Sequence, residues 1–345
     1  MSGDAKKGGE AKGKKAPTKF EKMQAELEGY FASWVEIVQP LNPFRITPAV
    51  AKPVEPEPGL FSGFKKITKG NSGLAVEELR IRLAGFGGIL PGTEFDDTLL
   101  GAVKRFEKDV MGRGATGQVD MDFAKALDAF AAAHPLSFTK KLKCPCGTCG
   151  GFGKGRHKDE YTSKYAASKN EAGHKYEYPG IHRSLLWACR SLIHYGSVIH
   201  KDKIRFMAFS SGYRCHDDNK LHVDPKTKKA RSSTNHMGKA VDLNFESKVG
   251  DKWVRDPGQS QTSTDADAMR QIAQDKLGAQ VSWNSTDKFA LEPGGKGAGH
   301  APTWVHMDVR TWNRDALDDH YFVQNLIDLD GTPMATLLVR PGSFE

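Results

Sequence analysis

The sequence predicts an α+β protein in which a single helix-covered antiparallel sheet follows a small three-helix domain. Two observations support this prediction. Helical stripes of apolar residues, separated by acidic turns, fill residues 60–133, whereas the composition changes from His134 onward. In that second part, residues 134–345, short strand-like runs are interleaved with two longer helical stretches. A single antiparallel sheet covered by helices is the most economical way to bury the apolar residues of both the strands and the helices.

Residues 1–59 are expected to lie outside these folded parts. The first 19 residues are rich in Gly and Lys and poor in apolar residues, which is typical of a disordered tail. Apolar residues at helical spacing predict an amphipathic helix over 20–38, and six prolines over 40–58 predict a stiff, extended linker. No apolar stretch follows the N-terminal charges, so we expect no secretory signal peptide.

Composition narrows the classes of protein further. At 345 residues the chain is long enough for two globular parts, and no stretch approaches the roughly 18 apolar residues of a membrane span. Five cysteines are too few for a disulfide-built scaffold of this length. The formal charge of +8 suits an acidic partner, such as a bacterial wall, and nucleic acid would fit the charge equally well.

Three helices are expected in residues 60–133. A Gly-rich turn leads into a helical stripe over 74–83, and the segment 93–106 is echoed by 117–127. In both echoing segments an acidic turn precedes a short helix with apolar residues three and four apart. The candidate N-caps of the two helices are Asp97 or Thr98, and Asp120 or Asp122.

The second part should contain four strands and two helices. We expect a helix over 179–196, ending at Gly196, and a helix over 264–277. The expected strands cover 204–210, 238–245, 279–283 and 303–309.

Side-chain alternation places polar groups on one face of two of these strands. On the last strand Trp304, His306 and Asp308 should point one way, and on the second strand Ala240 and Asp242 should share a face. The opposite faces, which are apolar, should pack in the core.

Three residues on or beside these strands form a candidate metal site, namely His236, Asp242 and His306. Two histidines and a carboxylate leave the fourth position of a tetrahedral zinc ion open. That arrangement is typical of a catalytic zinc, because a structural site closes all four positions. An ion with an open position can polarise a carbonyl oxygen and lower the pKa of a bound water.

Together with the run Ser210-Ser211-Gly212-Tyr213-Arg214, these segments resemble the M15 zinc peptidases, which cut peptides of bacterial peptidoglycan. The resemblance implies zinc binding by His236, Asp242 and His306 on an α+β fold. It also implies that Arg214 holds a substrate carboxylate or the developing oxyanion, for which a guanidinium offers paired donors. His236 and Asp242 are one position closer than is usual in that family, and the turn at Gly238 could absorb the difference.

The helical stretch over 68–130 resembles the small three-helix peptidoglycan-binding domain attached to many wall hydrolases. The order of a Gly-rich entry, a first helix, an acidic loop and two further helices matches. Glu107 and Ala124 depart from the residues usual at those places. The resemblance implies that peptidoglycan, rather than nucleic acid, is the partner.

The general base has two candidates. Thr303 and Trp304 stand where many M15 peptidases carry a residue that takes a proton, and neither can do so. Asp308, on the face of His306, could orient that ring or activate the water. His300, in the preceding Gly-rich loop, could swing in.

Cys144, Cys146 and Cys149 lie within six residues just before the sheet domain. Their spacing permits a second zinc ion with a fourth ligand such as His157. A disulfide with Cys215 and free thiols are the alternatives.

These observations predict a zinc-dependent peptidase that hydrolyses peptidoglycan stems or cross-links. The expected context is synthesis in the cytoplasm and action in the periplasm or cell wall, as for a phage endolysin or an injected effector. Residues 1–59 would then contact phage or contractile-secretion machinery. The alternative is a non-catalytic peptidoglycan-binding module with a structural or vestigial zinc site.

Overall fold

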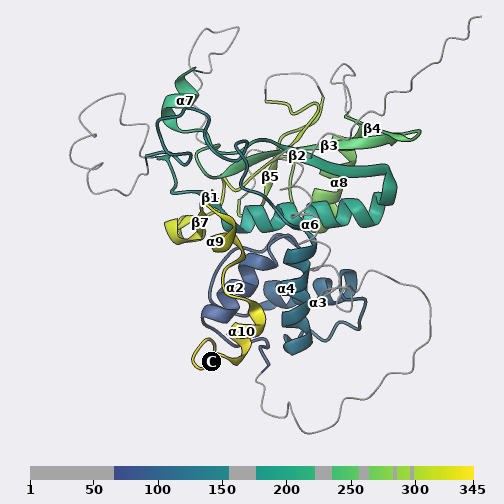
Figure 1. Cartoon of the computed structure of the whole chain (residues 1–345). Helices are drawn as coiled ribbons and strands as arrows, with labels where there is room; N and C mark the ends of the chain where they lie inside the picture. The colour runs from purple at the N-terminus through teal and green to yellow at the C-terminus, as the bar shows by residue number, and fades with distance from the viewer. Residues whose placement is uncertain (1–65, 155–175, 222–234, 256–263, 283–285, 296–298) are drawn as a thin grey trace, which may run out of the picture. The chain divides into compact units, whose positions relative to one another are not determined.

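The computed structural model describes residues 66–154, 176–221, 235–255, 264–282, 286–295 and 299–345 (Figure 1). Helices and antiparallel sheets occur together, which confirms the α+β class. The helix and the linker expected within residues 1–59 lie outside the described residues. Among the described helices, none has the length and apolar content needed to cross a membrane.

The three helices expected in residues 60–133 are formed: α2 (Leu74–Arg82), α3 (Asp97–Asp109) and α4 (Met121–Ala133). Asp120 caps α4 by accepting from the backbone N–H of Phe123, as expected. The cap of α3 is Asp96, and the prediction of Asp97 or Thr98 was wrong. Thr98 donates to the Asp96 carboxylate at 2.6 Å, which holds that carboxylate over the first turn.

The C-terminal segment returns to these helices. Its helices are α9 (Leu326–Asp330) and α10 (Met334–Val339), and α10 packs against α2 and α4. The backbone N–H of Ala75 donates to the carbonyl of Ser343 at 2.8 Å. Neither helix was predicted, because each has fewer than two turns and lacks a resolvable period.

The main sheet has the strand order β2-β3-β6-β5, with β4 paired to β3, and every pairing is antiparallel. Its strands are β2 (Ile204–Ser211), β3 (Ala240–Val249), β4 (Lys252–Val254), β5 (Ala290–Leu291) and β6 (Val305–Asp308). A second, two-stranded sheet pairs β1 (Ile181–His182) with β7 (Phe322–Val323). Short helical elements complete this part: η3 (Lys201–Lys203), α7 (His216–Leu221), η4 (Asp315–Leu317) and η5 (Asp319–Tyr321).

Over the described residues 279–282, the strand expected at 279–283 does not form. Ala279 instead closes the helix before it by donating to Ala273 O, and Gln280 makes a single bridge to Ala290. Residues 290–291 form the edge strand β5 in its place.

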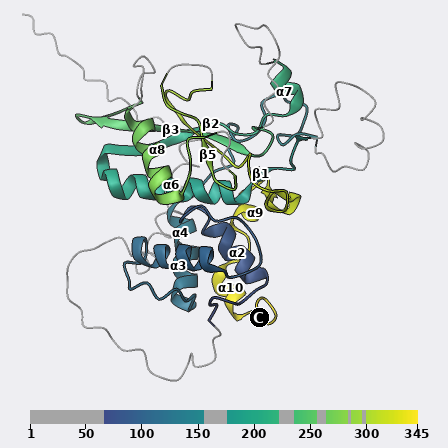
Figure 2. The same cartoon turned by 180° about the vertical axis from the view of Figure 1, so that it is seen from behind.

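Two helices, α6 (Arg183–His200) and α8 (Thr264–Leu277), lie on the same side of the main sheet (Figures 1 and 2). The bounds of α8 match the prediction, whereas α6 continues past Gly196, where we expected it to end. A Cβ at Gly196 would lie 2.7 Å from the methyl carbon of Met269 in α8. That glycine therefore permits close helix packing and does not end the helix.

Candidate metal site

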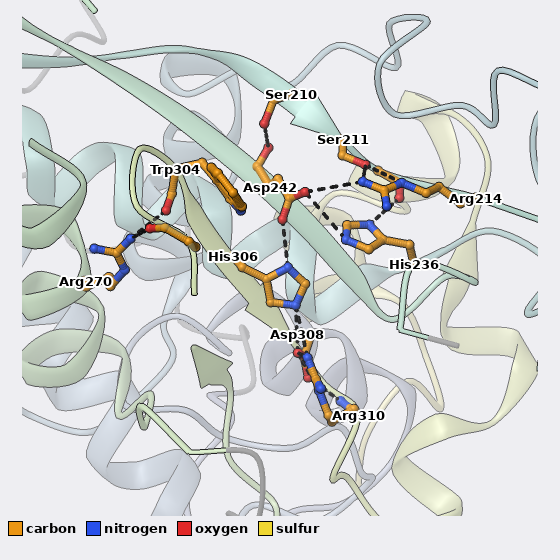
Figure 3. A network of polar contacts seen from close by, with 12 residues as sticks. Ser210, Ser211, Arg214, His236, Asp242, Arg270, Trp304, His306, Asp308 and Arg310 are labelled. Atoms are coloured by element: carbon orange, nitrogen blue, oxygen red, sulfur yellow. Dashed lines mark hydrogen bonds and ion pairs between the residues drawn. The ribbon is translucent and has the colours of Figure 1, made fainter. Parts of the chain in front are cut away.

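The site lies on the sheet face that points away from α6 and α8. Asp242 on β3 is the direct partner of His306 on β6, and Ser211 on β2 is its partner on the other side. Val241 and Leu243, which alternate with Asp242, are fully buried in the core. The predicted alternation thus places Asp242 and His306 side by side on one surface (Figure 3).

An irregularity in β2 decides which serine faces Asp242. Phe209 pairs with Leu243, but the next partner of β3, Asp242, pairs with Ser211. One extra residue, Ser210, is therefore accommodated on β2, as in a β-bulge. The bulge brings Ser211 into the row of Asp242 and His306.

His236 reaches the site from a tight turn before β3. The N–H of Lys239 donates to Asn235 O at 2.9 Å, and Gly238 has a φ of +109°. A Cβ at Gly238 would lie 2.5 Å from the carbonyl oxygen of Gly180. The turn that shortens the spacing between His236 and Asp242 therefore requires glycine on both conformational and steric grounds.

Donor atoms of His236, Asp242 and His306 lie within 4.8 Å of one another, and all three residues are buried. Nδ1 of His306 is 2.7 Å from Oδ1 of Asp242, and Nε2 of His236 is 3.5 Å from Oδ2. The structure brings together the three residues that the sequence nominated as metal ligands.

The remaining nitrogen of each ring has a protein partner. Nδ1 of His236 is 2.7 Å from the carbonyl oxygen of Gly212, so it carries the proton and leaves Nε2 as a lone-pair donor. Nε2 of His306 is 2.9 Å from Oδ2 of Asp308, which leaves Nδ1 facing Asp242. Two nitrogens and a carboxylate thus face one another, and this donor set suits zinc.

The protonation of the three groups follows from their burial and from one another. Burial lowers the pKa of His236 to about 4, so this ring is neutral at pH 7. Burial would also lower the pKa of His306, but its hydrogen bonds to Asp242 and Asp308 outweigh burial and raise it to about 10. Without a metal this ring is therefore protonated, and zinc would displace the proton on Nδ1. Burial would raise the pKa of Asp242, yet the two histidines and Arg214 hold it below its ordinary value.

Asp308 is fully buried behind His306. Besides Nε2 of His306, its carboxylate accepts from the backbone N–H of Arg310 at 2.9 Å and from Nε of Arg310 at 2.7 Å. With its amide oxygen toward Arg310, Asn235 accepts from both terminal nitrogens at 2.8 Å. These contacts make Asp308 a residue that orients His306, which is one of the two roles considered for it.

Arg214 lies beside the site, as the resemblance implied. Its Nε and Nη2 donate to Oγ of Ser211 at 3.1 and 2.8 Å, and Nη2 is 3.8 Å from Oδ2 of Asp242. Its backbone N–H donates to His236 O at 2.7 Å. The guanidinium is therefore held beside Asp242 and His236 (Figure 3).

His300, the other candidate base, contacts a different group. Its Nδ1 is 2.7 Å from the carbonyl oxygen of Gly294. Among the described residues, no hydrogen bond or ion pair joins His300 to His236, Asp242 or His306.

Ser211, Arg310 and Asn235 also contribute contacts to the site, although no such role was predicted for them from the sequence. Arg310 continues the 306, 308, 310 alternation and could have been found from it. Ser211 could not, because its direction depends on the bulge.

No protein-family model and no curated protein matches the chain. The interpretation of the site therefore depends on its geometry and on the motifs above.

Proposed function

We propose that the chain is a zinc-dependent peptidase acting on peptide bonds of bacterial peptidoglycan. The observation that carries the proposal is the convergence of His236 Nε2, an Asp242 carboxylate oxygen and His306 Nδ1, with the far nitrogen of each ring hydrogen-bonded to the protein. Zinc bound there would supply a Lewis acid that polarises the scissile carbonyl. Three protein ligands leave a coordination position for water or substrate, which favours a catalytic over a structural role.

Two further residues would stabilise the developing charge and orient a metal ligand. Arg214, fixed by Ser211, presents charged donors toward the site, where negative charge develops on the carbonyl oxygen during amide hydrolysis. Asp308 keeps the His306 ring in one orientation and one tautomer. Asp308 is fully buried and bound to both His306 and Arg310, which suits an orienting role rather than proton transfer from the attacking water.

The helices α2 to α4 would supply attachment to the wall. The support is the order of a Gly-rich entry, a first helix, an acidic loop and two Asp-capped helices, which resembles peptidoglycan-binding domains. A chain anchored on its insoluble substrate needs less affinity at the catalytic site, because the second contact becomes intramolecular.

The test is release of free amino groups from purified sacculi by the zinc-loaded full chain. His236→Ala should abolish release and lower bound zinc by one equivalent. His320→Ala, at a histidine whose side chain is 56% exposed, is the matched control and should change neither.

Two outcomes would contradict the proposal. Full zinc and activity in His236→Ala would remove the assigned ligand set. Sacculus binding with intact zinc but no amino-group release would favour a non-catalytic peptidoglycan-binding module.

A further inference from the structure

A second group of candidate metal ligands includes Cys215, the residue that follows Arg214. The sulfurs of Cys144, Cys146, Cys149 and Cys215 lie within 4.8 Å of one another. Three come from one short loop, and the fourth follows Arg214 directly. None of the four forms a disulfide in the structure.

We propose that these four cysteines form a closed structural zinc site that fixes the turn carrying Arg214. Four thiolates satisfy all positions of tetrahedral zinc and leave none for a substrate. Cys215 thus takes the fourth position, for which His157 was considered; His157 lies outside the described residues.

The sulfur spacing fits a shared ion. A Zn–S bond of about 2.3 Å in a tetrahedron puts neighbouring sulfurs about 3.8 Å apart. Cys215 Sγ and Cys146 Sγ are 3.6 Å apart, close to that edge length.

Backbone amides point at these sulfurs, as they should if the sulfurs are thiolates. The N–H of Cys215 donates to Cys144 Sγ at 3.3 Å, that of Thr148 to Cys146 Sγ at 3.4 Å, and that of Asp218 to Cys215 Sγ at 3.4 Å. Three of the four sulfurs therefore have a backbone N–H donor, and such a donor favours the charged form of a thiol.

The loop conformation depends on glycines that directly follow two of the cysteines. Gly147, after Cys146, has a φ of +75°, and Gly150, after Cys149, has a φ of +70°. Other residues adopt this conformation poorly. The turn at Gly147 brings the backbone N–H of Thr148 back to the sulfur of Cys146.

The consequence for the active site follows from the connections of the turn. Tyr213 N–H donates to Leu142 O at 2.9 Å, and Arg214 N–H to His236 O at 2.7 Å. A Cβ at Gly212 would lie 2.7 Å from the Cα of Leu142, so the two segments are in close backbone contact. A metal clip at Cys215 would hold both the Arg214 guanidinium and the Gly212 carbonyl that orients His236.

The experiment measures metal and thiols on the full chain purified without chelator. The wild type should hold two zinc equivalents, and the double variant His236→Ala/His306→Ala should keep one. Titration of that double variant with p-hydroxymercuribenzoate should release the remaining zinc in step with thiol modification. Cys215→Ser should lose this equivalent, whereas Cys189→Ser, at a fully buried cysteine in the core of α6, should not.

Hydrogen exchange gives a second readout. Amides of Tyr213, Arg214 and Cys215 should exchange faster in Cys215→Ser than in the wild type or Cys189→Ser. Because mercurial release is measured without a substitution in the cluster, misfolding of Cys215→Ser would not prevent the test.

Three outcomes would overturn the proposal: a double variant without zinc, iron in place of zinc, or fewer than five thiols after denaturation in chelator, which would indicate a disulfide. Failure of the proposed peptidase would instead appear as absent hydrolysis by a wild type with both zinc equivalents. The two hypotheses therefore fail separately.

Discussion

Asp308 Oδ2 lies 2.9 Å from Nε2 of His306, on the side of the imidazole opposite Asp242, whose Oδ1 lies 2.7 Å from Nδ1. The ring is thus held between two carboxylates, one able to share a metal with it and one buried behind it. The buried carboxylate has its pKa held at about 2, because its contacts with His306 and Arg310 outweigh burial, which alone would raise it. It therefore remains a charged acceptor at neutral pH.

Replacing this acceptor should weaken metal binding. Asp308→Asn removes the charge that increases the basicity of His306, and outer partners of this kind typically contribute about 10–100-fold in metal affinity. Competition with a chromophoric chelator would measure the loss. Asp97→Asn, at a side chain 77% exposed, is the control and should bind zinc like the wild type. Equal affinity in Asp308→Asn would remove the orienting role.

Arg214→Lys should slow hydrolysis of sacculi by about a hundredfold, because a point charge does not reproduce a planar two-pronged contact. Zinc content and the melting temperature should stay at the wild-type values. A lowered melting temperature with normal specific activity would instead mean that Arg214 stabilises the fold by pairing with Asp242.

Ser211→Ala should also slow hydrolysis, by about tenfold, since Ser211 Oγ accepts two hydrogen bonds from the Arg214 guanidinium. The matched control is Ser210→Ala, the adjacent residue, whose hydroxyl is 3.5 Å from the Asp242 carbonyl oxygen, at the limit of a hydrogen bond. Turnover on sacculi at saturating zinc would be measured for both. Equal rates in the two variants would show that the hydrogen bonds between Ser211 and Arg214 do not contribute to hydrolysis.

The pairing of Ser211 also shows where sequence reasoning ended. Alternation along 303–309 placed His306 and Asp308 on one face, because a strand has a fixed period of two. It could not place Ser211, since a bulge changes the face of every later residue without a sequence signal. The three metal-ligand candidates and the bounds of α8 followed from local patterns. The edge strand β5 and the C-terminal helices depend on long-range pairing, which a single sequence does not reveal.

A buried ion pair links the helical part to the sheet part, and its loss should destabilise the protein. Glu78 in α2 accepts two hydrogen bonds from Arg183 in α6, both at 2.6 Å, and a third from Arg82 at 2.5 Å. Glu78→Gln would leave the buried Arg183 guanidinium without its counter-charge, at a cost of about 3–5 kcal/mol, whereas Arg82 would keep its ion pair with Asp128. Chemical denaturation would measure the free energy of unfolding. Glu94→Gln is the control, at an exposed position before α3, and should change it by less than about 0.5 kcal/mol.

The stability of the protein should fall in mild acid, and His182 contributes to that fall. Its ring is fully buried, with Nε2 2.8 Å from the carbonyl oxygen of Ala316, and burial lowers its pKa to about 4. The unfolded chain takes up this proton below about pH 6.5, whereas the folded protein resists it down to about pH 4. The contribution of His182 is therefore complete above pH 6.5 and is lost as the pH falls through that window.

A variant isolates this contribution from that of other buried groups. His182→Phe keeps a ring against Trp312 and Phe322 but cannot take up a proton. Its melting temperature at pH 7 should be lower, because the Ala316 carbonyl loses its donor. Between pH 7 and pH 4.5, however, its melting temperature should fall less than that of the wild type. His320→Phe is the control, since this histidine is more than half exposed and its pKa is raised. Its removal should not reduce the fall in melting temperature between pH 7 and pH 4.5. An equal fall in melting temperature between pH 7 and pH 4.5 in His182→Phe and the wild type would contradict the contribution of His182.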